Sequence, residues 1–185
     1  MNIKKVFDTD KFFIIGIGGS GMSSIAKYLI ESGSSVFGYD QRKSSITNQL
    51  LKLGIKVTHD INFDIPNESL VITSSAIQNE NNLVQKANQK GLTIIYRPEF
   101  LSKLTRHYKT IGIAGTHGKT TTTALLSHIY QYNNINHSYI YGGMTSYSGI
   151  GGHFGDTNTL VIEADEAFKT FMNFELDNCI LTNID

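Results

Sequence analysis

The stretch KFFIIGIGGSGMSSIAKYLIESGSSVFGYD, residues 11–40, decides the fold. A short apolar run leads into a glycine cluster, and apolar residues then recur at the spacing of an amphipathic helix, at Met22, Ile25, Ala26, Leu29 and Ile30. Gly33 is placed to end that helix, and residues 35–39 form the next strand candidate, which ends at Asp40. The stretch therefore predicts one βαβ unit.

The same alternation continues along the chain. It predicts helices near residues 45–53, 82–90 and 98–104 and strands near residues 55–58, 70–73 and 92–96. Such alternation indicates a mostly parallel sheet with helices on both faces. The polar, basic stretch 105–109 is the best linker candidate. We therefore expect an α/β fold, with a Rossmann-like parallel-sheet domain over residues 1–106.

A second unit starts at residue 107, and its apolar strand, its glycine turn GTHGKT (115–120) and the helix after it predict the start of a P-loop ATPase α/β domain. Its predicted elements are a strand at 110–114, a glycine turn at 115–119, a helix at 120–130, and strands at 160–164 and 179–184. The predicted helix carries Leu125 and Ile129 on one face. Residues 142–155 contain six glycines and are expected to form a loop or a hairpin.

The composition narrows the possible partners and the compartment. The 185 residues include 16 Lys and Arg and 16 Asp and Glu, so no overall charge attracts nucleic acid or an anionic membrane. The apolar run after Lys4 and Lys5 is too short for a signal peptide or a membrane span. The single Cys179 lies in an apolar run and is expected to be a buried small hydrophobe. We expect a cytoplasmic protein.

The first glycine loop is a candidate diphosphate site. Gly16, Gly18 and Gly21 match G-x-G-x-x-G between a predicted strand and a predicted helix, where backbone N–H groups can bind phosphate oxygens. Asp40 stands about where a dinucleotide fold places an acid for a ribose hydroxyl. Taken alone, the loop suggests NAD or FAD. The alternative is that the glycines only permit close packing of strand on helix.

The second glycine loop, GTHGKT at residues 115–120, has the functional end of a phosphate loop. Its backbone N–H groups can hold phosphate, Lys119 can meet the β- and γ-phosphates, and the Thr120 hydroxyl can bind Mg²⁺. The general P-loop pattern has a glycine where Ile113 stands, so the match is incomplete. The alternative is a chance G-K-T in a surface turn.

A second metal ligand is expected at the end of a neighbouring strand. The acidic segment EADE, residues 163–166, follows a predicted strand, and Glu163 is the first choice. Asp165 and Glu166 are expected to be solvated or to contact an incoming amine. The six histidines show no spacing typical of zinc ligands.

The combination of these motifs resembles the Mur ligases, and among them the enzymes that add L-alanine. The similarity rests on FIIGIGGSGMS (13–23), SSAI (74–77), RPEFL (97–101), AGTHGKTTTT (114–123), EADE (163–166) and LTNID (181–185). These segments follow the order of the family and span nearly the whole chain. The phosphate loop with four threonines and the EADE segment are the most specific of them.

The resemblance implies an ATP- and Mg²⁺-dependent ligase that joins UDP-N-acetylmuramate to L-alanine through an acyl phosphate, in the synthesis of peptidoglycan precursors. It implies catalytic roles for Lys119, Thr120 and Glu163, and metal binding by Thr120 and Glu163. The implied ATP-binding residues are Gly115, Thr116, His117, Gly118, Lys119, Thr120 and Thr121. The implied UDP-sugar-binding residues are Gly16, Gly18, Gly19, Ser20, Gly21, Asp40, Ser74 and Ser75, so the first loop would hold UDP rather than NAD.

The sequence departs from the family after LTNID. Mur ligases continue with a histidine-bearing motif, the rest of the ATPase domain and a C-terminal domain. We therefore expect an incomplete second domain with an exposed sheet edge or face, and no turnover by the chain alone. Three rival interpretations stay open: a ligase that recycles murein tripeptide, a non-catalytic UDP-sugar-binding module, and an NAD-dependent dehydrogenase. The oligomeric state is not indicated.

Overall fold

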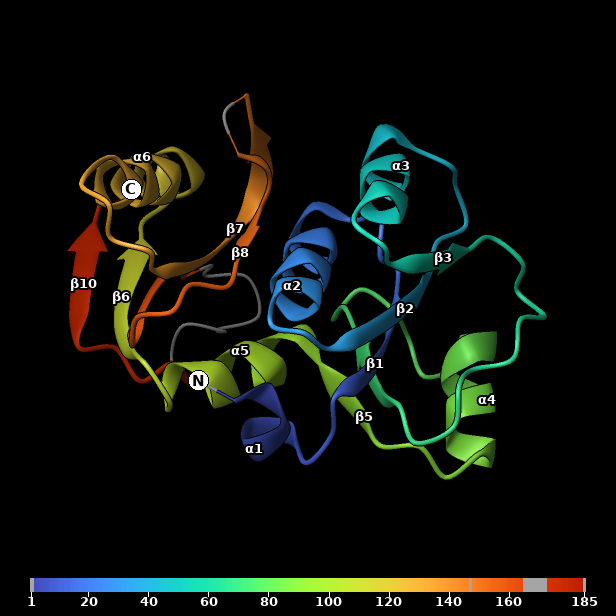
Figure 1. The fold of residues 1–185 in the computed structure, drawn as a ribbon. Coiled ribbons are helices and arrows are strands. Elements are labelled where there is room, and N and C mark those ends of the chain that lie inside the picture. Colours follow the sequence, from blue (N-terminus) through green and yellow to red (C-terminus); the bar gives the residue numbers. More distant parts are fainter. Residues whose placement is uncertain (1, 147, 165–172, 185) are drawn as a thin grey trace.

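The computed structural model of the chain describes residues 2–146, 148–164 and 173–184. Two five-stranded sheets stand beside each other, each with its own helices (Figure 1). The connection between them consists of residues 106–108, between the last helix of the first unit and the first strand of the second. Within the described residues, no helix combines the length and the apolar character needed to cross a membrane.

The first sheet is fully parallel and has the strand order β3-β2-β1-β4-β5. Its strands are β1 (Lys11–Ile15), β2 (Ser35–Tyr39), β3 (Lys56–Thr58), β4 (Leu70–Thr73) and β5 (Ile94–Tyr96). Its helices are α1 (Ile3–Phe7), α2 (Ser20–Glu31), α3 (Ser45–Lys52), α4 (Asn82–Gln89) and α5 (Arg97–Thr105). The predicted Rossmann-like α/β architecture is confirmed. The short helix α1 is an addition that the sequence pattern does not predict.

The central strand β1 is buried on both faces because its side chains alternate between two apolar clusters. Phe12 and Ile14 pack in the cluster that includes Leu29 of α2 and Phe100 of α5. Phe13 and Ile15 pack in the cluster that includes residues of α4. Burial on both faces explains why residues 12–15 are continuously apolar instead of alternating with polar residues.

The second sheet has the strand order β10-β6-β9-β7-β8. Its elements are β6 (Lys109–Ala114), α6 (Lys119–Tyr132), β7 (Ser138–Thr145), β8 (Gly149–His153), β9 (Thr159–Glu163) and β10 (Asn178–Leu181). β6, β7, β9 and β10 are parallel, and β8 returns antiparallel to β7. The glycine-rich segment is therefore a hairpin. The apolar start of β7 is a strand that the sequence pattern does not predict.

Helix α2 packs directly on this hairpin, as Figure 1 shows between the two sheets. A Cβ atom at Gly152 would collide with the carbonyl oxygen of Ser24, so glycine is required for the close approach. The Ser24 hydroxyl donates to the Tyr141 carbonyl oxygen at 2.7 Å, and Lys27 Nζ donates to the Ile150 carbonyl oxygen at 3.1 Å. One apolar cluster contains residues of both sheets, which fixes their relative position.

One expectation about a side chain of the second unit is wrong. Cys179 is exposed instead of buried, because β10 is an outer strand that pairs with β6 alone among the described residues. Leu125 and Ile129 share a face of α6, as predicted, and this face is exposed, with exposed fractions of 57% and 49%. The helix instead buries its small side chains, Thr123, Ala124 and Ser127. The second sheet thus has an exposed edge within the described residues.

Candidate functional site

The first glycine loop connects β1 to α2 at the carboxyl end of the sheet. Gly16 has a φ of +75°, which only glycine adopts without strain, and its carbonyl oxygen accepts a hydrogen bond of 3.0 Å from Gly19 N. Gly19 is the N-cap of α2, and no side chain caps the helix. The backbone N–H groups of the first turn, with the positive end of the helix dipole, therefore form a site suited to an anion.

Asp40 and the Ser74 turn lie at the same edge. Asp40 Oδ2 accepts a hydrogen bond of 2.8 Å from Gly18 N, and Asp40 Oδ1 accepts one of 3.0 Å from Arg42 N. Ser74 and Ser75 follow β4 in a turn whose Ile77 side chain would be 3.5 Å from a Cβ at Gly16. The predicted residues of the first site therefore meet where β1, β2 and β4 end, and Asp40 also braces the loop itself.

The second glycine loop connects β6 to α6. Gly115 and Gly118 have φ angles of +127° and +83°, and α6 begins at Lys119. Lys119 Nζ donates to the carbonyl oxygens of Gly115 at 2.5 Å and Thr116 at 3.1 Å. The ammonium group thus lies over the loop, and the loop joins strand to helix through two glycines of positive φ, a geometry that suits a phosphate.

Glu163 lies beside this loop because β9 pairs with β6, so that Glu163 stands opposite Ile113. The Thr120 hydroxyl donates to Glu163 Oε1 at 2.6 Å, and the Gly142 N–H donates to Glu163 Oε2 at 2.7 Å. A hydroxyl and a carboxylate are hard oxygen ligands of the kind that Mg²⁺ prefers. The arrangement therefore fits the expected metal pair. Asp165 and Glu166 lie outside the described residues.

The two loops approach each other at Gly142 and Gly143 of β7. A Cβ at Gly142 would be 3.4 Å from Glu163 Oε2 and 3.9 Å from Ser20 Oγ. A Cβ at Gly143 would be 2.9 Å from Thr120 Cγ2. Gly142 therefore lies between the start of α2 and the carboxylate of the second site. The sequence pattern assigns these glycines to a hairpin and misses their place between the sites.

Two residues near the end of the chain also contact the second loop. Asn183 Oδ1 accepts a hydrogen bond of 3.0 Å from His117 N, and the Thr182 hydroxyl donates to the His117 carbonyl oxygen at 2.6 Å. Both belong to the segment LTNID (181–185). The resemblance of this segment to the Mur ligases does not imply a role for either side chain. His117 is exposed and is held through its main chain.

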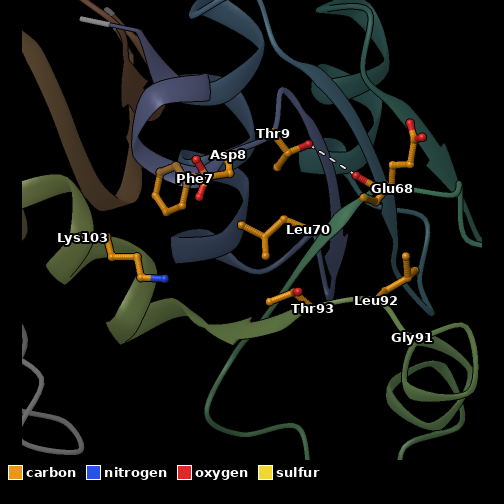
Figure 2. A pocket seen from close by; sticks show the side chains of 10 residues that line it. Phe7, Asp8, Thr9, Glu68, Leu70, Gly91, Leu92, Thr93 and Lys103 are labelled. Carbon is orange, nitrogen blue, oxygen red and sulfur yellow. Dashed lines mark hydrogen bonds between the residues drawn. The ribbon is translucent and has the colours of Figure 1, made fainter.

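A cavity of about 390 Å³ lies away from both loops (Figure 2). Its lining comes from the segments at the starts of β1, β4 and β5, together with Lys103 of α5: Phe7, Asp8, Thr9, Glu68, Ser69, Leu70, Gly91, Leu92, Thr93 and Lys103. These are the amino ends of parallel strands, whereas the glycine loop, Asp40 and Ser74 follow the carboxyl ends. The cavity therefore lies at the opposite edge of the first sheet and is separate from the candidate site.

Comparison with known proteins identifies relatives of the chain. The family model described as Mur ligase family, catalytic domain, matches residues 11–109, which contain the first glycine loop. The UDP-N-acetylmuramate–L-alanine ligase of Ruthia magnifica subsp. Calyptogena magnifica is 38% identical over 187 residues, covering 100% of this chain and 40% of the relative. That of Vesicomyosocius okutanii subsp. Calyptogena okutanii is 40% identical over 172 residues, covering 92% of this chain and 37% of the relative.

Solved structures of ligases superpose on the chain over most of its length. The UDP-N-acetylmuramate–alanine ligase of Thermotoga maritima superposes with a TM-score of 0.85 at 30% identity, over 94% of this chain and 41% of that protein. The UDP-N-acetylmuramate:L-alanyl-γ-D-glutamyl-meso-diaminopimelate ligase of Neisseria meningitides superposes with a TM-score of 0.80 at 26% identity, over 96% and 61%. The chain spans about 40% of the length of the curated relatives it matches. From its sequence match and its fold, the chain belongs to the Mur ligase family.

Proposed function

We propose that this chain supplies the sugar-nucleotide site and the ATP phosphate site of a ligase that joins L-alanine to UDP-N-acetylmuramate. The observation that carries the proposal is the position of Gly142, with Ser20 on one side and Glu163 on the other. A diphosphate at the start of α2 and a γ-phosphate at the second loop would then be neighbours. That proximity is what a reaction between a sugar carboxylate and ATP requires.

In this proposal the first unit, residues 1–106, binds the donor. The UDP diphosphate lies on the N–H groups at Ser20 and Gly21, while Gly18 and Gly19, whose N–H groups bond to Asp40 and Gly16, shape the loop around it. Asp40, Ser74 and Ser75 surround the nucleotide from the ends of β2 and β4. The loop geometry supports an anion at this place, and the choice of UDP-N-acetylmuramate rests on the names of the relatives.

The second unit, from residue 107, binds the phosphates of ATP. Backbone N–H groups at Gly115, Thr116, Gly118, Thr120 and Thr121 and the ammonium of Lys119 hold the β- and γ-phosphates, and His117, whose N–H bonds to Asn183, keeps the loop in shape. Thr120 and Glu163 hold Mg²⁺, which neutralises phosphate charge when it is bound. Their 2.6 Å contact supports this pairing, because it brings two oxygen ligands to one point.

The chemistry is a phosphoryl transfer followed by an acyl transfer. A carboxylate oxygen of the donor attacks the γ-phosphorus, the bond to ADP breaks, and an acyl phosphate forms. The amino group of L-alanine then attacks the acyl carbon, loses a proton and displaces inorganic phosphate, which leaves the amide. Lys119 stabilises charge on the equatorial oxygens during the first step, and the two loops hold the reacting groups in line.

L-Alanine is proposed as the acceptor because both curated relatives are named for it. The tripeptide-adding ligase of Neisseria meningitides is 26% identical to the chain, against 30% for the alanine ligase of Thermotoga maritima. A dehydrogenase explains the first glycine loop but gives no purpose to the contact between Thr120 and Glu163. A cytoplasmic location, where ATP and the sugar nucleotide would be available, belongs to the same proposal.

Calorimetric titration of two reciprocal variants tests the proposal. We expect the wild-type chain to bind both UDP-N-acetylmuramate and Mg·ATP. Gly18→Val should remove only the binding of UDP-N-acetylmuramate, since a Cβ at Gly18 would be 2.8 Å from Asp40 Oδ2. Lys119→Met should remove only the binding of Mg·ATP, so each variant is the control for the other. Binding of NAD but not of UDP-N-acetylmuramate by the folded wild-type chain would contradict the proposal.

A further inference from the structure

Arg97 lies at the same sheet edge as the first glycine loop. It directly follows β5 and is the first residue of α5, with Tyr96 as the N-cap. In the sheet order, β5 is next to β4, and β4 is next to β1, which leads into the loop. Asp40, Ser74 and Arg97 thus directly follow the ends of β2, β4 and β5 at one edge of the sheet.

The guanidinium group of Arg97 packs against the first turn of α2. A Cβ at Gly21 would be 2.8 Å from both Arg97 Cζ and Arg97 Nε, and 3.1 Å from Nη2. Any side chain at Gly21 would therefore displace the guanidinium. The third glycine of the G-x-G-x-x-G motif has a purpose here beyond the packing of helix on strand, because it gives a cation room beside the helix N-terminus.

The charge of Arg97 is left without a protein partner in the part of the chain that the structure describes. Its Nε is buried and has no hydrogen-bond acceptor, and none of the ion pairs among these residues includes Arg97. The nearest acid in sequence, Glu99, pairs with Lys103 at 3.2 Å. A buried donor on an always-charged group is costly unless an acceptor reaches it.

Two independent features therefore call for an anion at one point: the uncapped first turn of α2, and the neighbouring guanidinium of Arg97, whose buried Nε has no acceptor among the described residues. We propose that Arg97 binds the diphosphate of the sugar nucleotide, opposite the backbone N–H groups of the first glycine loop. This inference rests on the proposed function, and it adds a ligand-binding residue that the glycine motif does not contain. A guanidinium suits this task because its planar donors match two phosphate oxygens at once.

The contact predicts selectivity for the diphosphate over the nucleoside. Arg97 faces the turn at Gly21, whereas Asp40 and Ser74 surround the loop from other strands. Loss of the guanidinium should therefore weaken binding of every ligand that carries the diphosphate. Added salt should weaken binding to the wild-type chain more than to a variant without this charge, because ions screen the contact.

The experiment is a calorimetric titration of Arg97→Gln and Arg97→Lys with UDP-N-acetylmuramate, with UDP and with uridine. Arg106→Gln is the matched control, because Arg106 is exposed and pairs only with the exposed Glu175 among the described residues. We expect Arg97→Gln to weaken both UDP ligands about ten- to a hundredfold, from the loss of charged hydrogen bonds, and to leave any uridine binding unchanged. Arg97→Lys should weaken them less, and the control should match the wild type.

If the wild-type chain binds UDP-N-acetylmuramate and Arg97→Gln binds it with the same affinity, the inference is overturned and the proposed function still stands. Absence of sugar-nucleotide binding by the folded wild-type chain would instead overturn the proposed function, and the inference with it. If the variants fail to fold, the wild-type chain still provides a test by NMR. Saturation with UDP should shift the Arg97 Nε–H resonance and slow its exchange with solvent, and an unchanged resonance would overturn the inference.

Discussion

Thr120 and Glu163 are joined by a hydrogen bond of 2.6 Å, although 43 positions separate them in the sequence. The second carboxylate oxygen of Glu163 accepts from Gly142 N at 2.7 Å, so both oxygens are held. β6 and β9 are neighbours, and this pairing brings the loop threonine and the strand-end glutamate together. In the proposed function this contact would hold the two metal ligands in place before any ligand binds, which would lower the free-energy cost of organising the site.

Glu163→Gln should uncouple ATP binding from Mg²⁺. The amide oxygen can still accept from the Gly142 N–H, but the amide NH2 then faces the Thr120 hydroxyl, which must accept where it donated before, and the amide carries no charge for the metal. We expect Mg²⁺ to strengthen ATP binding in the wild type and to have no effect in the variant, measured by titration with and without MgCl₂. Urea unfolding should show a loss of about 1 kcal/mol. Glu175→Gln is the control on an exposed carboxylate, and an equal Mg²⁺ effect in both variants would refute the assignment.

Gly143→Val should disturb the second site and spare the first. A Cβ at this position would be 2.9 Å from Thr120 Cγ2, so the threonine must move away from Glu163. We expect weaker Mg·ATP binding by at least about tenfold, the cost of misplacing one metal ligand, with unchanged affinity for UDP-N-acetylmuramate. Met144→Val, at an exposed neighbouring position, is the matched control. Equal ATP affinity in Gly143→Val and the wild type would count against the placement of the site.

Asn183→Ala should loosen the phosphate loop at His117. The Asn183 side chain accepts from His117 N at 3.0 Å and donates to the His117 carbonyl oxygen at 3.3 Å, so it acts as a brace across the loop. Hydrogen exchange measured by NMR should become faster at the His117 amide in the variant. The amides of β1 serve as the internal control. An unchanged exchange rate at His117 would show that the loop holds its shape without Asn183.

His137 should make the stability of the chain depend on pH. Burial lowers the pKa of the fully buried His137 imidazole below its usual value, despite an opposing hydrogen bond to the Ile135 carbonyl, and the charge of nearby His153 lowers it further. As pH falls through about 6.5, the unfolded chain takes up a proton that the folded chain rejects, so stability falls. The loss continues until pH reaches the lowered pKa.

His137→Phe should reduce this loss, because an aromatic ring still packs between Tyr130 and Tyr139 but cannot be protonated. The free energy of unfolding, measured in urea from pH 7.5 to 5, should fall less steeply in the variant than in the wild type. Parallel curves for the two proteins would mean that the buried imidazole does not cause the acid sensitivity.

Much of the first unit could be predicted from the sequence because its signals are local. The apolar spacing from Met22 to Ile30 marks α2, and the glycines before it mark the turn. Local signals also place Lys119, Thr120 and Glu163 in the second unit. The glycine loop and the acidic strand end are each recognisable in the sequence, and parallel strands bring them to the same edge of the sheet.

The contacts between the units could not be predicted in this way. Ser24 meets Tyr141 across 117 positions, and no periodicity within either segment records that pairing. Gly142 and Gly143 look like ordinary hairpin glycines until Ser20 and Thr120 are placed next to them. Cys179 has the apolar neighbours of a core strand, and only the order of the strands shows that β10 is at the edge.

The most direct test of two phosphate sites in one chain is an NMR titration of the labelled protein with UDP-N-acetylmuramate and, separately, with Mg·ATP. We expect the sugar nucleotide to shift the amide resonances of Gly16, Gly18, Gly19, Ser20 and Gly21. We expect Mg·ATP to shift those of Gly115, Gly118, Lys119 and Thr120. If UDP-N-acetylmuramate shifts neither loop while NAD shifts the first, the proposed function is contradicted, and the first loop is a dinucleotide site.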